Sequence, residues 1–337
     1  MAQRIYPTGS HSHYCQGTCS NHYVSPTLAN PRSTLQDRIA IALGVPQITL
    51  RKYQWARHVT AKTPQSLCGQ YLNNKVYPPP KLVTDDYAVG YDQHGAILFL
   101  FLKGVIKTHL QILALLGLNQ MDFRTCGKQS RQELRKAVKF NEHESPKAAE
   151  LNVGWFFHGR AGYICEFNDT KRNRQHLPYI YPLLDHMTDW FAKTLPKQFW
   201  AQNRAIPREF RQGGTSAYST VTLLKSAPAA VHVDGNGIPY ACLTSVAPEK
   251  PHKYTGGTFC MVERGLSFSV QPGDLLIAST HKNHHCNLSP VINTKYSVIA
   301  YFKYQIRKTD LTSTILQDWY TEQANPGSWK LRKGRSK

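Results

Sequence analysis

The sequence predicts an α+β protein whose core is a β-sandwich or jelly roll, flanked by helices and preceded by an N-terminal extension. Short segments rich in β-branched and aromatic residues recur through residues 205–305, separated by glycine- and proline-containing turns. This spacing is typical of antiparallel sandwiches and jelly rolls. Several segments upstream instead repeat apolar residues at helical spacing. Hydrophobic residues make up 41% of the 337 residues, which suffices for a large core.

The N-terminal extension, residues 1–35, is a polar leader that contains two cysteines and three histidines. Thiolates and imidazoles at these intervals can bind Zn²⁺. A flexible histidine-rich leader with incidental thiols explains the same residues equally well. If zinc binds, the candidate ligands are Cys15, Cys19, His22 and either His11 or His13.

Residues 36–80 are predicted to form a small helical segment followed by a proline-rich linker. The segment 36–65 is interpreted as helical, with a first helix that starts at Leu35 and ends at Gly44. Consecutive prolines at residues 78–80 favour a rigid, extended connection to the next region.

Residues 81–308 are predicted to form the main domain. Before its core, the patterns predict strands over 87–102 around a turn at Gly95, and a buried helix over 107–117 ended by Gly117. Next come a basic amphipathic helix over 129–140, a hairpin over 154–167 and an amphipathic helix over 183–191.

The core of this domain, residues 205–305, consists of short predicted strands. They are expected at residues 218–224, 229–231, 256–262, 266–270, 275–278 and 296–302.

His232 and Asp234 stand at the end of one of these strands, where residues i and i+2 point to the same face. A second imidazole would complete a facial triad, the ligand set of non-haem Fe(II) oxygenases, which leaves coordination positions open. His284 and His285 follow about fifty residues later. Neighbouring strand residues face opposite ways, so only one of this pair can bind, and we favour His285 for its spacing to Lys295.

Lys295 and Ser297 form a second i, i+2 pair, ten residues after His285. An ammonium beside a hydroxyl, one strand from the metal, is a suitable seat for the far carboxylate of a dicarboxylic acid. The pattern therefore predicts a place for a co-substrate next to the metal.

The order of these motifs resembles the TET/JBP nucleobase oxygenases, which depend on Fe(II) and 2-oxoglutarate, and within them the fungal TET-like branch. The resemblance covers about residues 205–305 and extends weakly through 183–199. It is carried by residues 219–222, 230–234, 256–259, 272–276, 285–287, 290–291 and 295–297.

This resemblance implies a double-stranded β-helix (jelly-roll) fold for the core. It also implies that His232, Asp234 and His285 bind Fe(II), and that the metal uses O2. Lys295 would pair with the carboxylate of 2-oxoglutarate, with Ser297 assisting.

The chain departs from the fungal pattern at three positions. Leu224 stands where those relatives often carry Asn, Pro228 where a basic residue is common, and Gly237 where an Asp often follows. These changes affect expected contacts to co-substrate and base. An algal branch uses ascorbate, which stays an alternative to 2-oxoglutarate.

Charge is the other informative property: 41 Lys and Arg against 21 Asp and Glu give a net charge of +20. Such a field favours polyanions, of which nucleic acid is the commonest. A basic tail is predicted over residues 309–337. No apolar run is long enough for a membrane helix, so we expect no membrane partner. We expect a monomer that binds DNA in an intracellular compartment, the nucleus.

We therefore expect a dioxygenase that oxidises the methyl group of a methylated base in DNA, with the target base flipped out of the helix. The substrate would be 5-methylcytosine, oxidised to 5-hydroxymethylcytosine or further, or N6-methyladenine, which would be demethylated. Two alternatives stay open: a 2-oxoglutarate hydroxylase of proteins or small molecules, and a DNA-binding protein with an inactive oxygenase core.

Overall fold

The fold was analysed in a computed structural model of the chain. It describes residues 33–54, 67–72, 81–123, 149–158, 163–213, 216–234, 240–247, 255–281, 283–288, 291–292 and 294–306. Four predictions lie wholly or almost wholly outside these residues: the leader with its candidate zinc ligands, the proline-rich linker at 78–80, the basic helix over 129–140, and the tail over 309–337.

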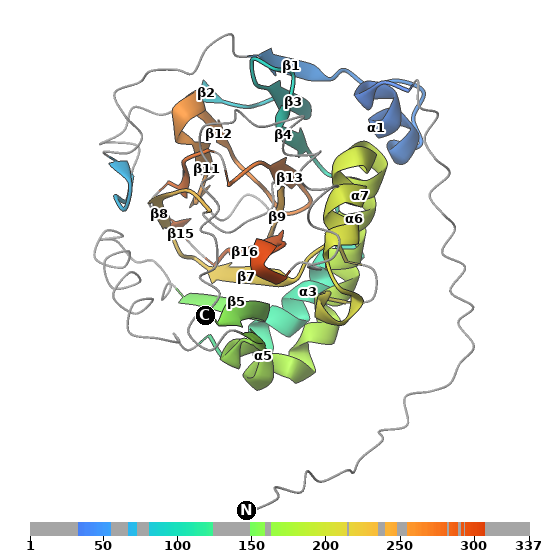
Figure 1. Cartoon of the computed structure of the whole chain (residues 1–337). Helices are drawn as coiled ribbons and strands as arrows, with labels where there is room; N and C mark the ends of the chain where they lie inside the picture. Colours follow the sequence, from blue (N-terminus) through green and yellow to red (C-terminus); the bar gives the residue numbers. More distant parts are fainter. Residues whose placement is uncertain are drawn as a thin grey trace, which may run out of the picture.

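Two facing sheets dominate the described part of the chain (Figure 1). The large sheet has nine strands, in the order β1-β3-β4-β13-β9-β16-β7-β5-β6. Their bounds are β1 Arg51–Gln54, β3 Tyr87–Tyr91, β4 Ile97–Leu102, β5 Ala149–His158, β6 Tyr163–Glu166, β7 Thr220–Lys225, β9 Ala241–Val246, β13 Leu275–Ala278 and β16 Tyr296–Tyr301.

The small sheet has five strands, in the order β2-β12-β11-β14-β8, and a further pair joins β10 to β15. Their bounds are β2 Lys81–Leu82, β8 Ala229–His232, β10 Thr255–Gly256, β11 Phe259–Met261, β12 Leu266–Phe268, β14 His285–Asn287 and β15 Val291–Ile292.

From β7 onward the chain passes back and forth between the two sheets. β7, β9, β13 and β16 belong to the large sheet, while β8, the β11–β12 hairpin and β14 belong to the small one. This alternation is the topology of a jelly roll, so the predicted double-stranded β-helix core is confirmed.

Helices cover the outer face of the large sheet, on the right and bottom of Figure 1. The residues on this face of β16, namely Tyr296, Val298 and Ala300, are buried against them in the main hydrophobic core. The helices are α1 Leu35–Leu43, α3 Thr108–Gln120, α5 Asn168–Asn173, α6 Tyr181–Thr194 and α7 Pro196–Ala205, with 3-10 turns at Arg174–Tyr179, Arg208–Phe210, Val262–Arg264 and Tyr304–Ile306.

A second apolar cluster fills one half of the space between the sheets. Phe99 and Phe101 of β4 meet Phe268 of β12 there, with ring centroids 4.7 and 5.5 Å apart. The other half, between β7, β16 and β5 on one side and β8 and β14 on the other, holds a cavity lined by polar and apolar side chains.

The first predicted helix is confirmed at both ends. Thr34 and Asp37 form a capping box at its start, and Gly44 ends it with a left-handed φ of 70°. The helical interpretation of 36–65 is wrong for Arg51–Gln54, which form β1 and pair in parallel with β3, and residues 55–65 lie outside the described residues.

Two other boundaries differ from the prediction. Gly117 does not end α3, which continues to Gln120; a Cβ at Gly117 would lie 2.7 Å from the Cβ of Tyr179, so the glycine serves close packing. The predicted strand over 256–262 is broken into β10 and β11. In the described part of the chain, no helix is both long and apolar enough to cross a bilayer.

Candidate active site

Three potential metal ligands meet at one end of the inter-sheet space. His232 ends β8 and His285 begins β14, and the two are direct cross-strand partners. Asp234 follows β8, and its backbone N–H donates to the carbonyl of Thr280 at 3.3 Å. One nitrogen or oxygen of each side chain lies within 4.8 Å of the others.

Backbone carbonyls fix the orientation of both imidazoles. His232 Nδ1 lies 2.7 Å from the carbonyl of Ala230, and His285 Nδ1 lies 3.0 Å from the carbonyl of Asn283. Since a carbonyl can only accept, each Nδ1 carries the proton and each Nε2 presents a lone pair. The phenyl ring of Phe259 stacks on the His285 ring at 5.4 Å.

The lone pairs and the carboxylate converge on a space that fits a metal ion. Asp234 Oδ1 lies 3.6 Å from His232 Nε2, and Oδ2 lies 3.7 Å from His285 Nε2. Both separations exceed a hydrogen bond, and two imidazoles with one carboxylate are the donor set of non-haem Fe(II) sites. The residues therefore fit the Fe(II) ion that the fold implies.

The strand geometry turns the two neighbouring histidines in opposite directions. His285 points into the space beside His232, whereas His284 points the other way, where its Nδ1 contacts Glu263 Oε1. Burial, then the neighbouring His232, lowers the pKa of His285 to about 4. The ring is therefore neutral at physiological pH, the state that binds metals.

A cavity of about 260 Å³ opens beside the three ligands. Its other wall is the inner face of the large sheet, where Glu150 and Asn152 of β5, Thr222 of β7 and Tyr301 of β16 lie. We call these four residues the polar wall. Asn152 pairs with Thr222, and Glu150, two residues earlier on β5, pairs with Leu224.

The polar wall is internally hydrogen-bonded. Asn152 Nδ2 donates to Glu150 Oε1 at 2.8 Å, and Thr222 Oγ1 donates to Asn152 Oδ1 at 2.7 Å. The hydroxyl of Tyr301 lies 3.2 Å from Thr222 Oγ1. These bonds hold the side chains in one arrangement, as a recognition surface requires.

An ammonium and aromatic rings border the polar wall. Lys303 Nζ lies 4.8 Å from the ring centroid of Phe167 and 6.0 Å from that of Tyr301. Burial lowers the pKa of Lys303, an effect that Asp234 and Glu150 partly oppose. Phe167 also stacks on Phe156 at 4.5 Å.

The predicted co-substrate residues lie near this centre but do not line the cavity in the described part of the chain. Lys295 is buried just before β16, and its Nζ donates to the carbonyl of Gly257 at 3.2 Å. Burial lowers its pKa to about 8. Ser297 lies on the same face of β16 as Tyr301, paired with Leu224, which does line the cavity. Their role as carboxylate ligands stays a prediction.

Two of the departures from the fungal pattern have a structural context. Leu224 places an apolar side chain in the cavity wall, and Pro228 is buried in the loop before β8. Gly237 lies outside the described residues.

The polar wall was not predicted from the sequence. Glu150 and Asn152 alternate with Ala149, Leu151 and Val153, all buried on the helix-covered face. That alternation is itself a strand signal and would have placed the two polar residues on one face. Their position opposite the metal ligands depends on pairing between β5 and β7, about seventy residues apart.

Comparisons with known proteins were made at the level of sequence and of structure. No family model matches the chain. Thymine dioxygenase JBP1-A of Trypanosoma cruzi (strain CL Brener) is 29% identical over 126 residues, which are 37% of this chain and 14% of that protein. Thymine dioxygenase JBP1 of Trypanosoma brucei brucei is 30% identical over 109 residues, 31% of this chain and 12% of that protein.

The match therefore spans about one seventh of the length of these relatives. The solved structure of NgTET1 in complex with 5mC DNA superposes with a TM-score of 0.53 at 10% identity. The superposition covers 81% of this chain and 90% of that chain. At this identity the likeness establishes a shared fold.

Proposed function

We propose that the chain is a 2-oxoglutarate–Fe(II) oxygenase of the TET/JBP type and that it oxidises the methyl group of a base in DNA. One observation carries the proposal: the His232–Asp234–His285 cluster faces the polar wall across a single cavity. A group held on that wall would present its edge to the metal. When bound, Fe(II) with 2-oxoglutarate and O2 supplies the oxidising chemistry for a C–H bond.

The protein residues supply positioning. His232, Asp234 and His285 would hold one face of the metal and leave the other positions for O2 and the co-substrate. Lys295 would pair with the far carboxylate of 2-oxoglutarate, assisted by Ser297.

A flat, partly polar ring suits the remaining space. The polar wall offers hydrogen-bond donors and acceptors, and the aromatic and ammonium groups around Lys303 and Phe167 can contact a ring face or a phosphate. A base inside a duplex cannot reach this cavity, so it would have to flip out, at a cost of a few kcal/mol.

The matched proteins point to the C5 methyl group of pyrimidines. The relatives carry thymine in their names, and NgTET1 was solved with 5mC DNA; both bases carry a methyl at C5. We accordingly propose a C5-methylpyrimidine, with N6-methyladenine as the competing substrate. A monomer acting in the nucleus completes the proposal.

The test is turnover of defined duplexes by the full chain. Duplexes with one 5-methylcytosine, one N6-methyladenine or unmodified bases are incubated with Fe(II), 2-oxoglutarate and air, and nucleosides are measured by mass spectrometry. We expect oxidation at a C5 methyl, absent in His232→Ala. Conversion of 2-oxoglutarate without any nucleoside change would contradict the DNA substrate and favour a protein or small-molecule hydroxylase. Product formation with ascorbate and without 2-oxoglutarate would show that ascorbate is the co-substrate.

A further inference from the structure

The polar wall has a fixed pattern of hydrogen-bond donors and acceptors, set by Glu150. A carboxylate only accepts hydrogen bonds, so the amide group of Asn152 must turn its nitrogen toward Glu150. The amide oxygen then faces Thr222, whose hydroxyl donates to it. The chemistry of one residue thus determines the orientation of its neighbour.

Toward the cavity, this arrangement presents an acceptor next to a donor. The Glu150 carboxylate keeps lone pairs beyond the one that Asn152 uses, and the second N–H of the Asn152 amide is still available. The two residues are successive inward-facing positions on β5, so the two groups lie side by side along the strand.

The two C5-methylpyrimidines differ in this pattern. Cytosine carries an amino group, a donor, at position 4 and an unprotonated ring nitrogen, an acceptor, at position 3. Thymine has the reverse, a carbonyl at position 4 and an N–H at position 3. The acceptor–donor order of Glu150 and Asn152 therefore complements cytosine, whereas thymine would set its carbonyl against a carboxylate.

We propose that Glu150 makes this enzyme selective for 5-methylcytosine over thymine. The proposal rests on the proposed function, since it concerns the base that occupies the cavity. It separates this chain from the relatives whose names contain thymine. Lys303 places an ammonium 6.0 Å from the ring centroid of Tyr301, a residue of the polar wall.

The test compares two duplexes that differ in one base, 5-methylcytosine or thymine, each opposite an abasic position so that neither base loses a pairing partner. Initial rates at low DNA concentration give kcat/KM for each. We expect the wild-type protein to favour 5-methylcytosine by at least about tenfold, the scale of one correctly paired recognition group. Glu150→Gln should lower this ratio by at least about tenfold, because an amide can turn its NH2 toward the thymine carbonyl.

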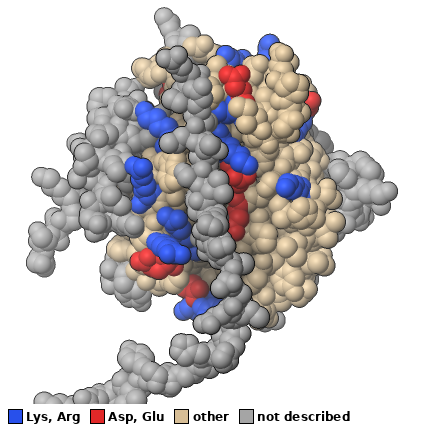
Figure 2. Space-filling model, turned by 90° about the vertical axis from the view of Figure 1, so that its right-hand side faces the viewer, with Lys and Arg blue, Asp and Glu red and all other residues tan. Residues whose placement is uncertain are grey.

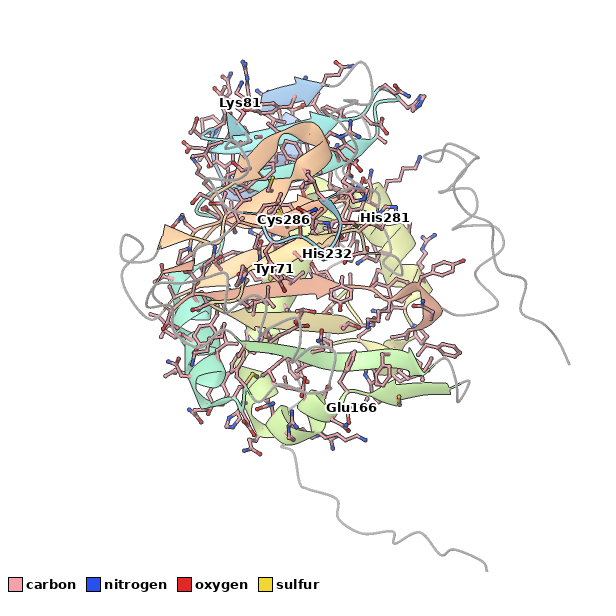
Figure 3. All side chains as sticks on the ribbon, turned by 90° about the vertical axis from the view of Figure 1, so that its left-hand side faces the viewer. Tyr71, Lys81, Glu166, His232, His281 and Cys286 are labelled. Carbon is pink, nitrogen blue, oxygen red and sulfur yellow. The ribbon has the colours of Figure 1, made fainter. Side chains whose placement is uncertain are left out.

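Glu166→Gln is the matched control. Glu166 lies at the end of β6, at the lower edge of the face shown in Figure 3 and away from His232, where it pairs with Arg174 at 2.6 Å. The ratio should stay at the wild-type value in this variant. Equal melting temperatures for the wild type and Glu150→Gln show that the fold is retained.

A binding measurement makes the result independent of turnover. With Mn(II) in place of Fe(II), fluorescence anisotropy gives the affinity for each duplex, and the preference for 5-methylcytosine should be lost in Glu150→Gln. Equal handling of the two bases by the wild type, in rate or in affinity, would overturn the selectivity proposal while leaving the oxidation of DNA bases intact. A binding preference for 5-methylcytosine without oxidation of either base would support the selectivity and contradict the proposed function.

Discussion

At the scale of single residues, the candidate metal centre depends on two backbone carbonyls as much as on its three proposed ligands. Ala230 and Asn283 accept from the Nδ1 atoms of His232 and His285, and each carbonyl lies two residues before its histidine. The same local geometry at two cross-strand partners directs both Nε2 atoms to Asp234. Such partners outside the ligand set commonly fix tautomer and ring orientation in metal sites.

The neighbouring histidines provide a matched test of the metal site. Binding to the folded state alone stabilises a protein by about 2.7 kcal/mol when the ligand is present at one hundred times its Kd. We expect Mn(II) to raise the melting temperature of the wild type and of His284→Ala, and to leave that of His285→Ala unchanged. A metal-induced rise in His285→Ala, measured by differential scanning fluorimetry, would reject His285 as a ligand.

Lys295 gives a pH dependence whose direction follows from burial. Its pKa is lowered to about 8 from an ordinary 10.5, so the ammonium loses its proton as pH rises through 8. The neutral form cannot pair with a carboxylate, and the affinity for 2-oxoglutarate should fall about tenfold between pH 7 and pH 9. Between pH 8 and pH 10.5 the unfolded chain holds this proton while the folded chain has lost it. The free energy of unfolding should therefore rise with pH across this window.

Titration calorimetry of 2-oxoglutarate binding, with Mn(II) present, measures this dependence. Lys295→Arg is the control, since a guanidinium stays protonated across the range and should remove the pH dependence. An affinity that stays constant in the wild type from pH 7 to pH 9 would show that Lys295 is not the carboxylate partner.

The sequence predicted the groups that a local motif brings together and missed those that depend on distant pairing. His232 and Asp234 are two residues apart, and His285 was found because the facial triad requires a third ligand. Glu150 and Asn152 belong to no such motif. They reach the cavity only because β5 pairs with β7, and nothing in the local sequence specifies that partner.

At the scale of elements, helix ends were predictable where the terminating residue acts locally. Gly44 ends α1 because the last residue adopts φ 70°, which glycine adopts without strain. Gly117 has the same identity and a different role: α3 continues past it, and the missing side chain lets Tyr179 approach. That role depends on a neighbour about sixty residues away, so the local pattern could not reveal it.

A glycine in β5 should be more sensitive than a glycine in a turn. Gly154 has φ +103°, and a Cβ there would lie 2.3 Å from the carbonyl oxygen of Ser219. Gly95 has φ +80° with nothing within 4 Å of the added atom. We expect Gly95→Ala to cost about 1–2 kcal/mol in unfolding free energy for the backbone conformation alone.

For Gly154→Ala, a steric cost of about 1–3 kcal/mol adds to the same conformational cost. Because Gly154 follows Asn152 on the inner face of β5, the shift it forces should also disturb the polar wall. Urea unfolding of the two variants gives the comparison. Equal destabilisation of the two would show that β5 accommodates the added methyl without displacement.

At the scale of the whole molecule, the chain carries a net charge of +20. Figure 2 shows Lys and Arg interspersed with Asp and Glu on the face that is turned toward the viewer. Two arginines of one basic run, Arg172 and Arg174, lie against Asp169 and Glu166. The net positive charge of the chain gives a general attraction for polyanions, and we propose that the cavity supplies the selectivity.

This division predicts how salt should affect the two properties. Each phosphate contact lowers the slope of log affinity against log salt concentration by about 0.9, so about five contacts give a slope between −4 and −5. The preference for a methylated base arises inside the cavity, where mobile ions screen little, and should change by less than about twofold over the same range. Anisotropy titrations of methylated and unmethylated duplexes from low to moderate salt measure both quantities at once. DNA affinity independent of salt would contradict a role for the net charge, and a base preference that disappeared in parallel with affinity would place recognition on the surface instead of on the polar wall.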